Sequence, residues 1–581
     1  MDCAFTNTKN FFSPRIKAAF LFTTAAFAIG CAANQSAMNQ PSIEAPELLL
    51  TGGTVLTMDA ARPRAEAVFV RQGRVVAVGG SKELREMASP RARVVELSGR
   101  TLIPGLVDGH CHLFGLGHSL EILSLRGLKS PEAVLELVSK SASARPSGEW
   151  ITGRGWDQNL WSPPVFPSHS ALDSASEKHP IALRRIDGHA LWSNRVAIRL
   201  AGITKETPDP PGGTIVRDSN GDPTGIFIDR AMELIESKIP PDSGETLERK
   251  ILAAAHKALS LGITGVHEMG IESATIEAYR RLNAQGRLGL RVYAYASGES
   301  HAKDFSAWKP DRDADGTAMF VLRGVKFFAD GALGSRGAAL LSPYSDAAES
   351  SGLVLMPEAD LKAAALSALK SGFQVAVHAI GDRANRMVLN AFEQAFLEFR
   401  SSFNAGDFDP RFRVEHAQIV DPSDLNRFAK LGVIASMQPT HATSDMAWAK
   451  ARLGPERLIG AYAWKSLLSS GAHIVFGSDF PVEEMSPMLG LYAAVTRQDS
   501  DGNPPLGFTP EQRISLEDAL RMFTAEPAHA SFTEAHRGKI AKGFVADFTV
   551  FEGDLRPDKS LLSLPVDFTI IGGRVVYERK P

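Results

Sequence analysis

Two histidines two residues apart carry the clearest chemical signal in this sequence. His110 and His112 follow residues 101–107, a short apolar run rich in branched side chains that predicts a buried strand. Residues i and i+2 of a strand project to the same side, so both imidazoles should point to one place. Neutral imidazole nitrogen is a preferred ligand of zinc. The pair therefore predicts part of a site for a divalent metal ion.

Other strand-like runs also end in residues that bind metals or move protons. These residues are Lys326 with Asp330, His378, Glu415 with His416, and Asp479. If the strands are parallel, their carboxyl ends meet on one face, and we expect these side chains to converge with His110 and His112. Metal-binding imidazoles also need acceptors that fix their tautomer, and Asp108 and Glu415 are the candidates.

The segments that must position these residues alternate between strand-like and helix-like patterns. The predicted strands are residues 101–109, 263–269, 289–296, 321–329, 373–379, 411–417, 432–438 and 473–478. Helical periodicity separates most of them, as in residues 246–261, 359–371 and 383–400. This alternation predicts an α/β fold, and eight units predict a (β/α)8 TIM barrel with its active site at the carboxyl ends of the strands.

Short strands with glycine turns occupy both ends of the chain. Neither residues 46–100 nor residues 537–581 hold enough strands for a stable sheet alone, so we expect one composite β-sandwich built from both. The barrel domain would then span residues 101–536. Within it, residues 113–243 are too long for an unstructured loop. We predict a subdomain inserted after barrel strand 1 that covers or shapes the active site.

The N-terminal residues have the pattern of an export signal. Basic residues precede a short apolar stretch, and small residues lead into Cys31, as in the lipobox of bacterial lipoproteins. We predict a lipoprotein-type signal peptide over residues 1–30, lipidation of Cys31 and a flexible tether over residues 31–45. The protein would be exported to the cell envelope, on the outer membrane or periplasmic side, with the lipid as its membrane anchor. An ordinary signal peptide or an uncleaved anchor is the alternative.

Composition excludes several classes of protein. Hydrophobic residues make up 44% and charged residues 22% of the 581, which is typical of a folded globular chain. A formal net charge of -3 without a long basic run gives no support to nucleic-acid binding. Cys111 is the one cysteine of three inside the predicted fold, so we expect neither a disulfide framework nor a cysteine-based zinc site. The sequence also lacks the G-x-S-x-G motif of many serine hydrolases.

Taken together, the motifs resemble the amidohydrolase superfamily, specifically its amidohydrolase-3 (YtcJ-like) branch of metal-dependent hydrolases. In chain order they are PGLVDGHCH at 104–112, GWD at 155–157, DGH at 187–189, KFFADG at 326–331, HAIGD at 378–382, EH at 415–416, GSD at 477–479 and GKIAKGFVAD at 538–547. The resemblance covers about residues 46–580.

The resemblance implies a role for each residue of the constellation. His110 and His112 would bind the more buried metal ion, and His378 and His416 the second. Lys326 would be carboxylated and bridge the two ions. Asp479 would contact the metal-bound water and act as the general base. The alternative for Lys326 is a pairing with Asp330 or the substrate, which would leave one divalent ion instead of two; zinc is the metal we expect.

Eight residues are candidates for the substrate pocket: Trp156, Asp157, Asp187, His189, His267, Asp330, Arg336 and His441. The first four lie in the insertion, where the resemblance favours a pocket role and hydrogen bonding within the subdomain is the alternative. His267 ends the second strand beside Glu268, and one of the two should face inward. Asp330 and Arg336 follow the fourth strand, where ordering of a loop is the alternative. His441 follows the seventh strand.

These observations predict a hydrolase of non-peptide C–N bonds, such as the amide or N-substituted formamide-like bond of a small molecule. Metal-bound hydroxide would attack the carbonyl, because a divalent ion lowers the pKa of its water from about 15.7 toward about 7. Asp479 would pass the proton to the leaving amine. An ester, lactone or carbamate hydrolase would use the same site. The alternative of another class is a catalytically inactive, surface-anchored binding protein. The sequence carries no signal for oligomeric state.

Overall fold

The computed structural model describes residues 47–186, 188–298, 309–403 and 409–580. The predicted signal peptide, Cys31 and the tether lie outside the described residues, as does Asp187, so those assignments stay predictions. Within the described ranges, no helix has both the length and the apolar character needed to cross a bilayer.

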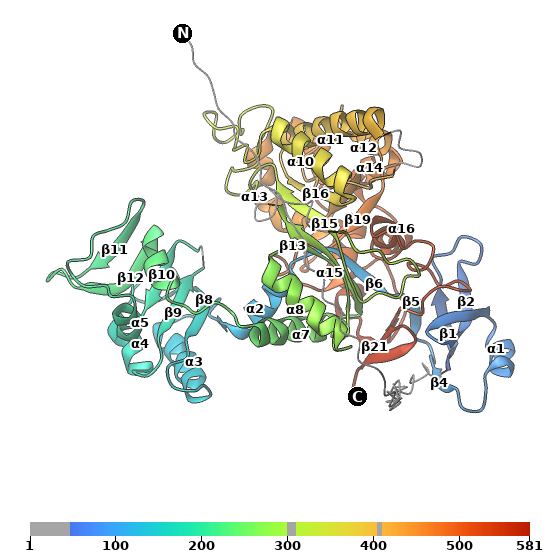
Figure 1. The fold of residues 1–581 in the computed structure, drawn as a ribbon, viewed down its shortest axis with the longest axis horizontal. Coiled ribbons are helices and arrows are strands. Elements are labelled where there is room, and N and C mark those ends of the chain that lie inside the picture. The colour runs from blue at the N-terminus through green and yellow to red at the C-terminus, as the bar shows by residue number, and fades with distance from the viewer. Residues whose placement is uncertain (1–46, 187, 299–308, 404–408, 581) are drawn as a thin grey trace, which may run out of the picture. The chain divides into compact units, whose positions relative to one another are not determined.

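Eight parallel strands in the middle of the chain form a barrel (Figure 1). In pairing order they are β6 (Leu106–Cys111), β13 (Ile263–Ile271), β14 (Arg291–Ser297), β15 (Phe320–Phe328), β16 (Gln374–Ala379), β17 (Arg413–His416), β18 (Ile434–Met437) and β19 (Ile474–Phe476). Past the end of β19, the backbone N–H of Asp479 donates to the carbonyl of His110 at 2.8 Å and joins the last strand to the first. The predicted (β/α)8 barrel is confirmed.

Helices follow the strands around the barrel. They are α7 (Gly244–Ser260), α8 (Ser273–Ala284), α10 (Glu358–Ser371), α11 (Asp382–Phe403), α12 (Leu425–Leu431), α13 (Pro439–Arg457), α14 (Trp464–Ser469), α15 (Pro487–Thr496), α16 (Leu516–Met522) and α17 (Ala525–Ala530). Because helices cover one face of each strand and barrel side chains cover the other, residues of β6, β17 and β19 are buried on both faces. That burial explains the unbroken apolar runs in the sequence.

The first predicted strand, residues 101–109, is wrong as a single element. It breaks at Gly105 into β5 (Thr101–Pro104), which belongs to another sheet, and the barrel strand β6. A side chain at Gly105 would meet Thr264 Oγ1 at 2.2 Å, so only glycine allows this close crossing. The N–H of Gly105 donates to the carbonyl of Asp547 at 2.8 Å. The barrel therefore begins at Leu106, and the chain changes sheets one residue earlier.

Strands from both chain ends share one eight-stranded sheet, where the sequence predicted a composite β-sandwich. They are β1 (Leu48–Leu56), β2 (Arg64–Arg71), β3 (Arg74–Gly79), β4 (Arg93–Glu96), β5, β20 (Phe548–Phe551), β21 (Val566–Ile571) and β22 (Arg574–Glu578). Strand β5 joins the two ends, because it pairs in parallel with β1 and antiparallel with β20. Leu50 and Val68 share a core with Phe548 and Val550. Helix α1 (Ser81–Met87) follows β3.

The insertion has its own sheet and core, which agrees with an inserted subdomain. Its strands are β7 (Leu123–Ser124), β8 (Ile151–Trp156), β9 (Ile181–Arg185), β10 (Ala190–Ser193), β11 (Gly213–Arg217) and β12 (Pro223–Asp229). Its helices are α3 (Pro131–Ser143), α4 (His169–Ala175), α5 (Arg195–Leu200) and α6 (Glu233–Glu236). The chain leaves the barrel through α2 (Leu113–Glu121) and returns through α7. These two helices are joined by an ion pair between Arg249 and Glu121 at 2.7 Å.

Candidate active site

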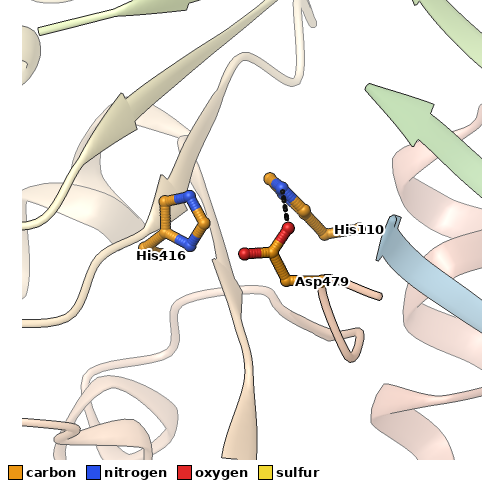
Figure 2. Close-up of side chains that lie close together, drawn as sticks. All are labelled: His110, His416 and Asp479. Atoms are coloured by element: carbon orange, nitrogen blue, oxygen red, sulfur yellow. Dashed lines mark ion pairs between the residues drawn. The ribbon is translucent and has the colours of Figure 1, made fainter. Parts of the chain in front are cut away.

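Side chains from three barrel strands face one another at the carboxyl ends of the strands (Figure 2). His110 comes from β6, His416 from β17, and Asp479 follows β19. All three are buried, and one ligand atom from each lies within 4.8 Å of the others. Two imidazoles and one carboxylate at this spacing form a ligand set that suits zinc and related divalent ions.

Two buried atoms of this group support the assignment of a metal centre. Nε2 of His110 and Oδ1 of Asp479 lie 3.4 Å apart, yet neither has a hydrogen-bond partner. An unsatisfied buried polar group costs about 1–3 kcal/mol, so such atoms call for a physical reason. A divalent cation held between them would satisfy both, and the residues present therefore fit a metal ion.

His112 brings a third imidazole to the same carboxylate. Its Nε2 lies 3.3 Å from Oδ1 of Asp479. Its Nδ1 lies 3.1 Å from the carbonyl of Met269, and because a carbonyl only accepts, Nδ1 carries the hydrogen. The lone pair of Nε2 is left for a metal ion.

His110 and His416 are oriented in the same way. Nδ1 of His110 contacts Oε2 of Glu415 at 2.6 Å, and Nδ1 of His416 contacts Oε1 of Gln438 at 2.8 Å. Both partners are acceptors, so each histidine donates through Nδ1 and presents Nε2. Of the two candidates for orienting an imidazole, Glu415 does so. Asp108 instead accepts from the hydroxyl of Ser478 at 2.6 Å.

Left-handed backbone explains how neighbouring residues on one strand both serve the site. Glu415 and His416 should point to opposite faces of an extended strand. His416 has φ of 72° and Ala417 has φ of 41°, so the chain turns where β17 ends. Asp479 has φ of 61°. Such conformations are uncommon outside glycine, and they concentrate at functional sites.

A buried arginine that was not predicted from the sequence, Arg413, is hydrogen-bonded to Glu415. Arg413 donates to both carboxylate oxygens of Glu415 at 2.7 and 2.9 Å and to the carbonyl of Gly109 at 2.7 Å. Burial opposes ionisation of Glu415, but the charge of Arg413 prevails and holds the pKa of that carboxyl well below its ordinary value. The available signal was the i, i+2 spacing of Arg413 and Glu415, which puts both on one strand face.

Lys326 is buried inside the barrel and lines a cavity with His112, His378, His416 and Asp479. Burial lowers the pKa of its amine to about 8, although the nearby carboxylates of the site oppose the shift. A lower pKa increases the fraction of neutral amine, which is the form that can be carboxylated. The lowered pKa therefore suits the predicted carboxylation of Lys326.

His378 lies beside His416, with ring centroids 4.6 Å apart. Its Nε2 is 3.5 Å from Oδ1 of Asp330. Burial, with the charge of Lys326, lowers the pKa of His378 to about 3, so the imidazole is neutral and able to act as a ligand.

The cavity in front of these residues has a volume of about 380 Å³, which suits a small molecule. Phe328, Leu333 and Trp448 supply apolar lining. The remaining polar lining includes His441, a candidate for the substrate pocket, together with Gln418, Asp445 and Glu483. Nε2 of His441 is 3.6 Å from Oδ2 of Asp479 and has no hydrogen-bond partner. Of the seven pocket candidates that the structure describes, His441 is the one among the lining residues of this cavity.

The other barrel candidates have different surroundings. His267 accepts a hydrogen bond from Arg413 at 2.7 Å and lines a separate, small cavity with Arg291. Asp330 accepts from the N–H groups of Ala339, Ile380 and Gly381 at 2.8, 2.9 and 2.8 Å, which favours its alternative role of ordering a loop. Arg336 pairs with Asp346 at 3.0 Å, which also fits that alternative. Glu268 accepts at the first N–H groups of α2, including that of Phe114 at 3.0 Å.

The described candidates in the insertion bond within that subdomain. Trp156 is buried and its Nε1 donates to the carbonyl of Leu183 at 2.7 Å. Asp157 pairs with Arg185 at 2.8 Å, and His189 contacts Asp229 at 2.8 Å. None of these three is among the lining residues of the cavity at the metal centre. Their roles in a substrate pocket, and the covering role of the insertion, stay predictions.

Sequence reasoning also missed Asp445 and Trp448. With His441 they follow the spacing i, i+4 and i+7 in residues 439–457, which puts them on one face of helix α13. This helical periodicity is the sequence signal that identifies all three residues.

Comparisons with known proteins identify the family of this chain. Residues 93–577 match the model of the amidohydrolase family. The chain is 34% identical to YtcJ of Bacillus subtilis, a protein named as an amidohydrolase, over 91% of this chain and 99% of that protein. It is 29% identical to the N-substituted formamide deformylase of Arthrobacter pascens, over 92% of this chain and 98% of that enzyme. The solved structure of an uncharacterised metal-dependent hydrolase from Pyrococcus furiosus is 31% identical, with a TM-score of 0.73 over 87% of this chain and 99% of that one.

Proposed function

Because this chain belongs to the amidohydrolase family and is a metal-dependent hydrolase, we propose that it cleaves a non-peptide C–N bond of a small molecule. The bond we favour is an amide or N-substituted formamide-like bond. The observation that carries the proposal is the arrangement of His110, His112 and His416, whose Nε2 atoms are free for a metal ion beside Asp479. Similarity to a formamide deformylase supports the choice of bond.

Each residue of the site has a defined task under this proposal. His110, His112 and Asp479 would hold one divalent ion, for which we propose zinc. His378 and His416, with a carboxylated Lys326, would hold a second. Such an ion lowers the pKa of water toward about 7 and polarises a carbonyl. The protein contributes fixed ligands, oriented by Glu415, Met269 and Gln438.

Asp479 is placed to move the proton. Burial opposes its ionisation, but the nearby imidazoles of His110 and His112 hold the pKa of the carboxyl well below its ordinary value. It is therefore ionised and able to accept a proton from the attacking water. Its Oδ1 faces the two histidines while its Oδ2 faces His441, so one oxygen can serve the metal ion and the other the proton. The proton then passes to the leaving nitrogen.

The test is hydrolysis of a panel of N-acyl amines and N-substituted formamides. We expect chelation to abolish turnover and added zinc or manganese to restore it. Asp479→Asn should reduce kcat by about 10²–10⁴-fold, the usual contribution of a general base. Glu484→Gln, which changes an exposed carboxylate that follows the lining residue Glu483 and does not itself line the cavity, is the control.

Three outcomes would contradict parts of the proposal. Turnover that survives chelation or Asp479→Asn would overturn the mechanism. Cleavage of esters, lactones or carbamates without amides would overturn the bond. Near-zero metal content, with no activity after zinc or manganese is added, would favour a binding protein.

A further inference from the structure

One wall of the active-site cavity is rich in hydrogen-bond acceptors. This acceptor wall consists of Gln418, which follows β17, Asp445 on α13, and Glu483, which follows Asp479 by four residues. Trp448 lies one turn along α13 from Asp445, on the same helix face, and also lines the cavity. An aromatic ring and two carboxylates thus border the space in front of the metal ligands.

The donors of Gln418 are already used inside the wall. Its Nε2 donates to the hydroxyl of Tyr462 at 2.8 Å and to Oδ2 of Asp445, and that hydroxyl donates to Oδ2 of Asp445 at 2.7 Å. An amide NH₂ has two hydrogens, so only the oxygen of Gln418 remains. Gln418 is 4% exposed, and its Oε1 has no hydrogen-bond partner. A buried acceptor with no partner at a cavity wall indicates a ligand that donates.

Glu483 adds a second carboxylate to the acceptor wall, and Trp448 adds an aromatic ring beside it. Glu483 accepts from the hydroxyl of Ser444 at 2.6 Å through Oε1, and it is partly exposed to the cavity. The ring of Trp448 packs against Gly334, where a Cβ would approach the indole to 3.2 Å. The guanidinium carbon of Arg452 already lies 5.9 Å from the ring centroid of Trp448. Trp448 therefore supplies planar apolar surface, and the preference for a cation comes from the carboxylates of Asp445 and Glu483.

We propose that this wall selects substrates bearing a protonated amine next to an apolar or planar group. The inference rests on the proposed function, because the scissile bond must lie at the metal centre while the ammonium group reaches the wall. The ammonium would donate to Oε1 of Gln418 and to the carboxylates of Asp445 and Glu483. The apolar part would lie against Trp448 and Phe328, which also lines the cavity.

A matched substrate pair tests the charge directly. N-[4-(aminomethyl)benzyl]formamide carries the ammonium, and N-(4-ethylbenzyl)formamide has nearly the same shape without it. We expect kcat/KM to favour the cation by about tenfold, close to the contribution of one hydrogen bond to a charged group. Glu483→Gln should reduce that ratio, and Asp445→Asn should reduce it as well. Glu484→Gln, an exposed neighbour outside the lining, should leave it unchanged.

Binding without turnover separates this inference from the proposed function. The probes are 4-(aminomethyl)benzyl alcohol and 4-ethylbenzyl alcohol, whose binding to the metal-loaded enzyme is measured by ligand-observed NMR. Tighter binding of the cation that is lost in Glu483→Gln supports the wall, even if no formamide is hydrolysed. Equal binding of the two alcohols, a preference for the neutral one, or a preference that Glu483→Gln leaves intact would overturn the inference while leaving the hydrolase assignment standing.

Discussion

At the residue scale, the site depends on acceptors that orient imidazoles. His110, His112 and His416 each use Nδ1 for a different acceptor, so all three present Nε2 to the same region. The histidines could be predicted from the sequence, because each stands where a strand-like run ends. Of the three acceptors, Glu415 could also be predicted, as a candidate beside Asp108. The other two could not: one is a backbone carbonyl, and Gln438 follows the end of another strand. Each histidine is paired with its acceptor by the arrangement of neighbouring strands in space.

Removal of the charge at Glu415 tests that orientation. We expect Glu415→Gln to weaken metal binding by about 10- to 100-fold, because a neutral amide is a poorer acceptor for Nδ1 of His110. The variant also leaves Arg413 without its counter-ion, so the metal-free protein should be less stable by about 3–5 kcal/mol. Competition with a coloured chelator measures the first effect and urea unfolding the second. Glu526→Gln is the matched control, since Glu526 contacts His473 at 2.8 Å outside the site. Unchanged metal affinity in Glu415→Gln would refute the role.

Lys326 makes a second prediction at this scale. If a carboxylated Lys326 bridges two ions, the wild-type protein should bind two metal ions per chain and Lys326→Ala one. Acetate or propionate should then restore part of the second ion's binding, because a free carboxylate can take the place of the carbamate. Elemental analysis after dialysis measures the ratio, with Lys257→Ala on α7 as the control. One ion per chain in the wild type would favour the alternative pairing of Lys326 with Asp330 or the substrate.

At the element scale, strand ends and crossings position the site. Apolar runs allowed the barrel strands to be predicted, since a strand buried on both faces needs no polar alternation. The break at Gly105 and the left-handed turns at His416 and Asp479 could not be predicted in this way. They arise because two sheets, or two strand ends, approach each other closely in space. The pattern of neighbouring residues in the sequence carries no information about such an approach.

The contact between β19 and β6 gives a prediction about such a close approach. Gly477 follows β19, and a Cβ there would lie 2.4 Å from the backbone nitrogen of His110 and 2.7 Å from Oδ1 of Asp108. We expect Gly477→Ala to push these segments apart, to cost about 1–3 kcal/mol of stability and to displace Asp479 from the histidines. The temperature of thermal unfolding and the metal affinity would both fall. Gly289→Ala, where the nearest atom would be at 3.7 Å, should be close to neutral, and equal behaviour of the two variants would contradict the argument.

At the scale of the whole molecule, the C-terminal strands are bonded to the barrel as well as to the N-terminal strands. The hydroxyl of Thr549 donates to the carbonyl of Gly262 at 2.6 Å, and that of Thr569 to the carbonyl of Leu259 at 2.6 Å. The joining of both chain ends could be predicted because neither end alone completes a sheet. The hydrogen bonds of Thr549 and Thr569 could not be predicted, since their partners lie hundreds of residues away in the chain.

A buried ion pair also links Arg291 at the start of β14 with Asp547 just before β20. Arg291 donates to both oxygens of Asp547 at 2.7 and 3.0 Å, and both side chains are buried. We expect Asp547→Asn to destabilise the fold by about 3–5 kcal/mol, because it leaves a buried guanidinium without its partner. Arg291→Met with Asp547→Asn should cost less than the sum of the single changes, as a double-mutant cycle of unfolding free energies would show. The exposed pair of Arg93 and Glu578 at 3.0 Å is the control, with an expected coupling of about 0–1 kcal/mol.

The same pair has a pH dependence whose sign follows from its surroundings. Burial raises the pKa of Asp547, but the charge of Arg291 outweighs it and leaves that pKa below the ordinary 3.8. A carboxyl with a lowered folded pKa stabilises the fold above its unfolded pKa and loses that contribution as the pH falls through the folded value. The stability gap between wild type and Asp547→Asn should therefore be full at neutral pH and shrink in acid. A gap that stays constant from pH 7 to the acid unfolding limit would show that Asp547 acts through packing, and that charge does not tie the C-terminal strands to the barrel.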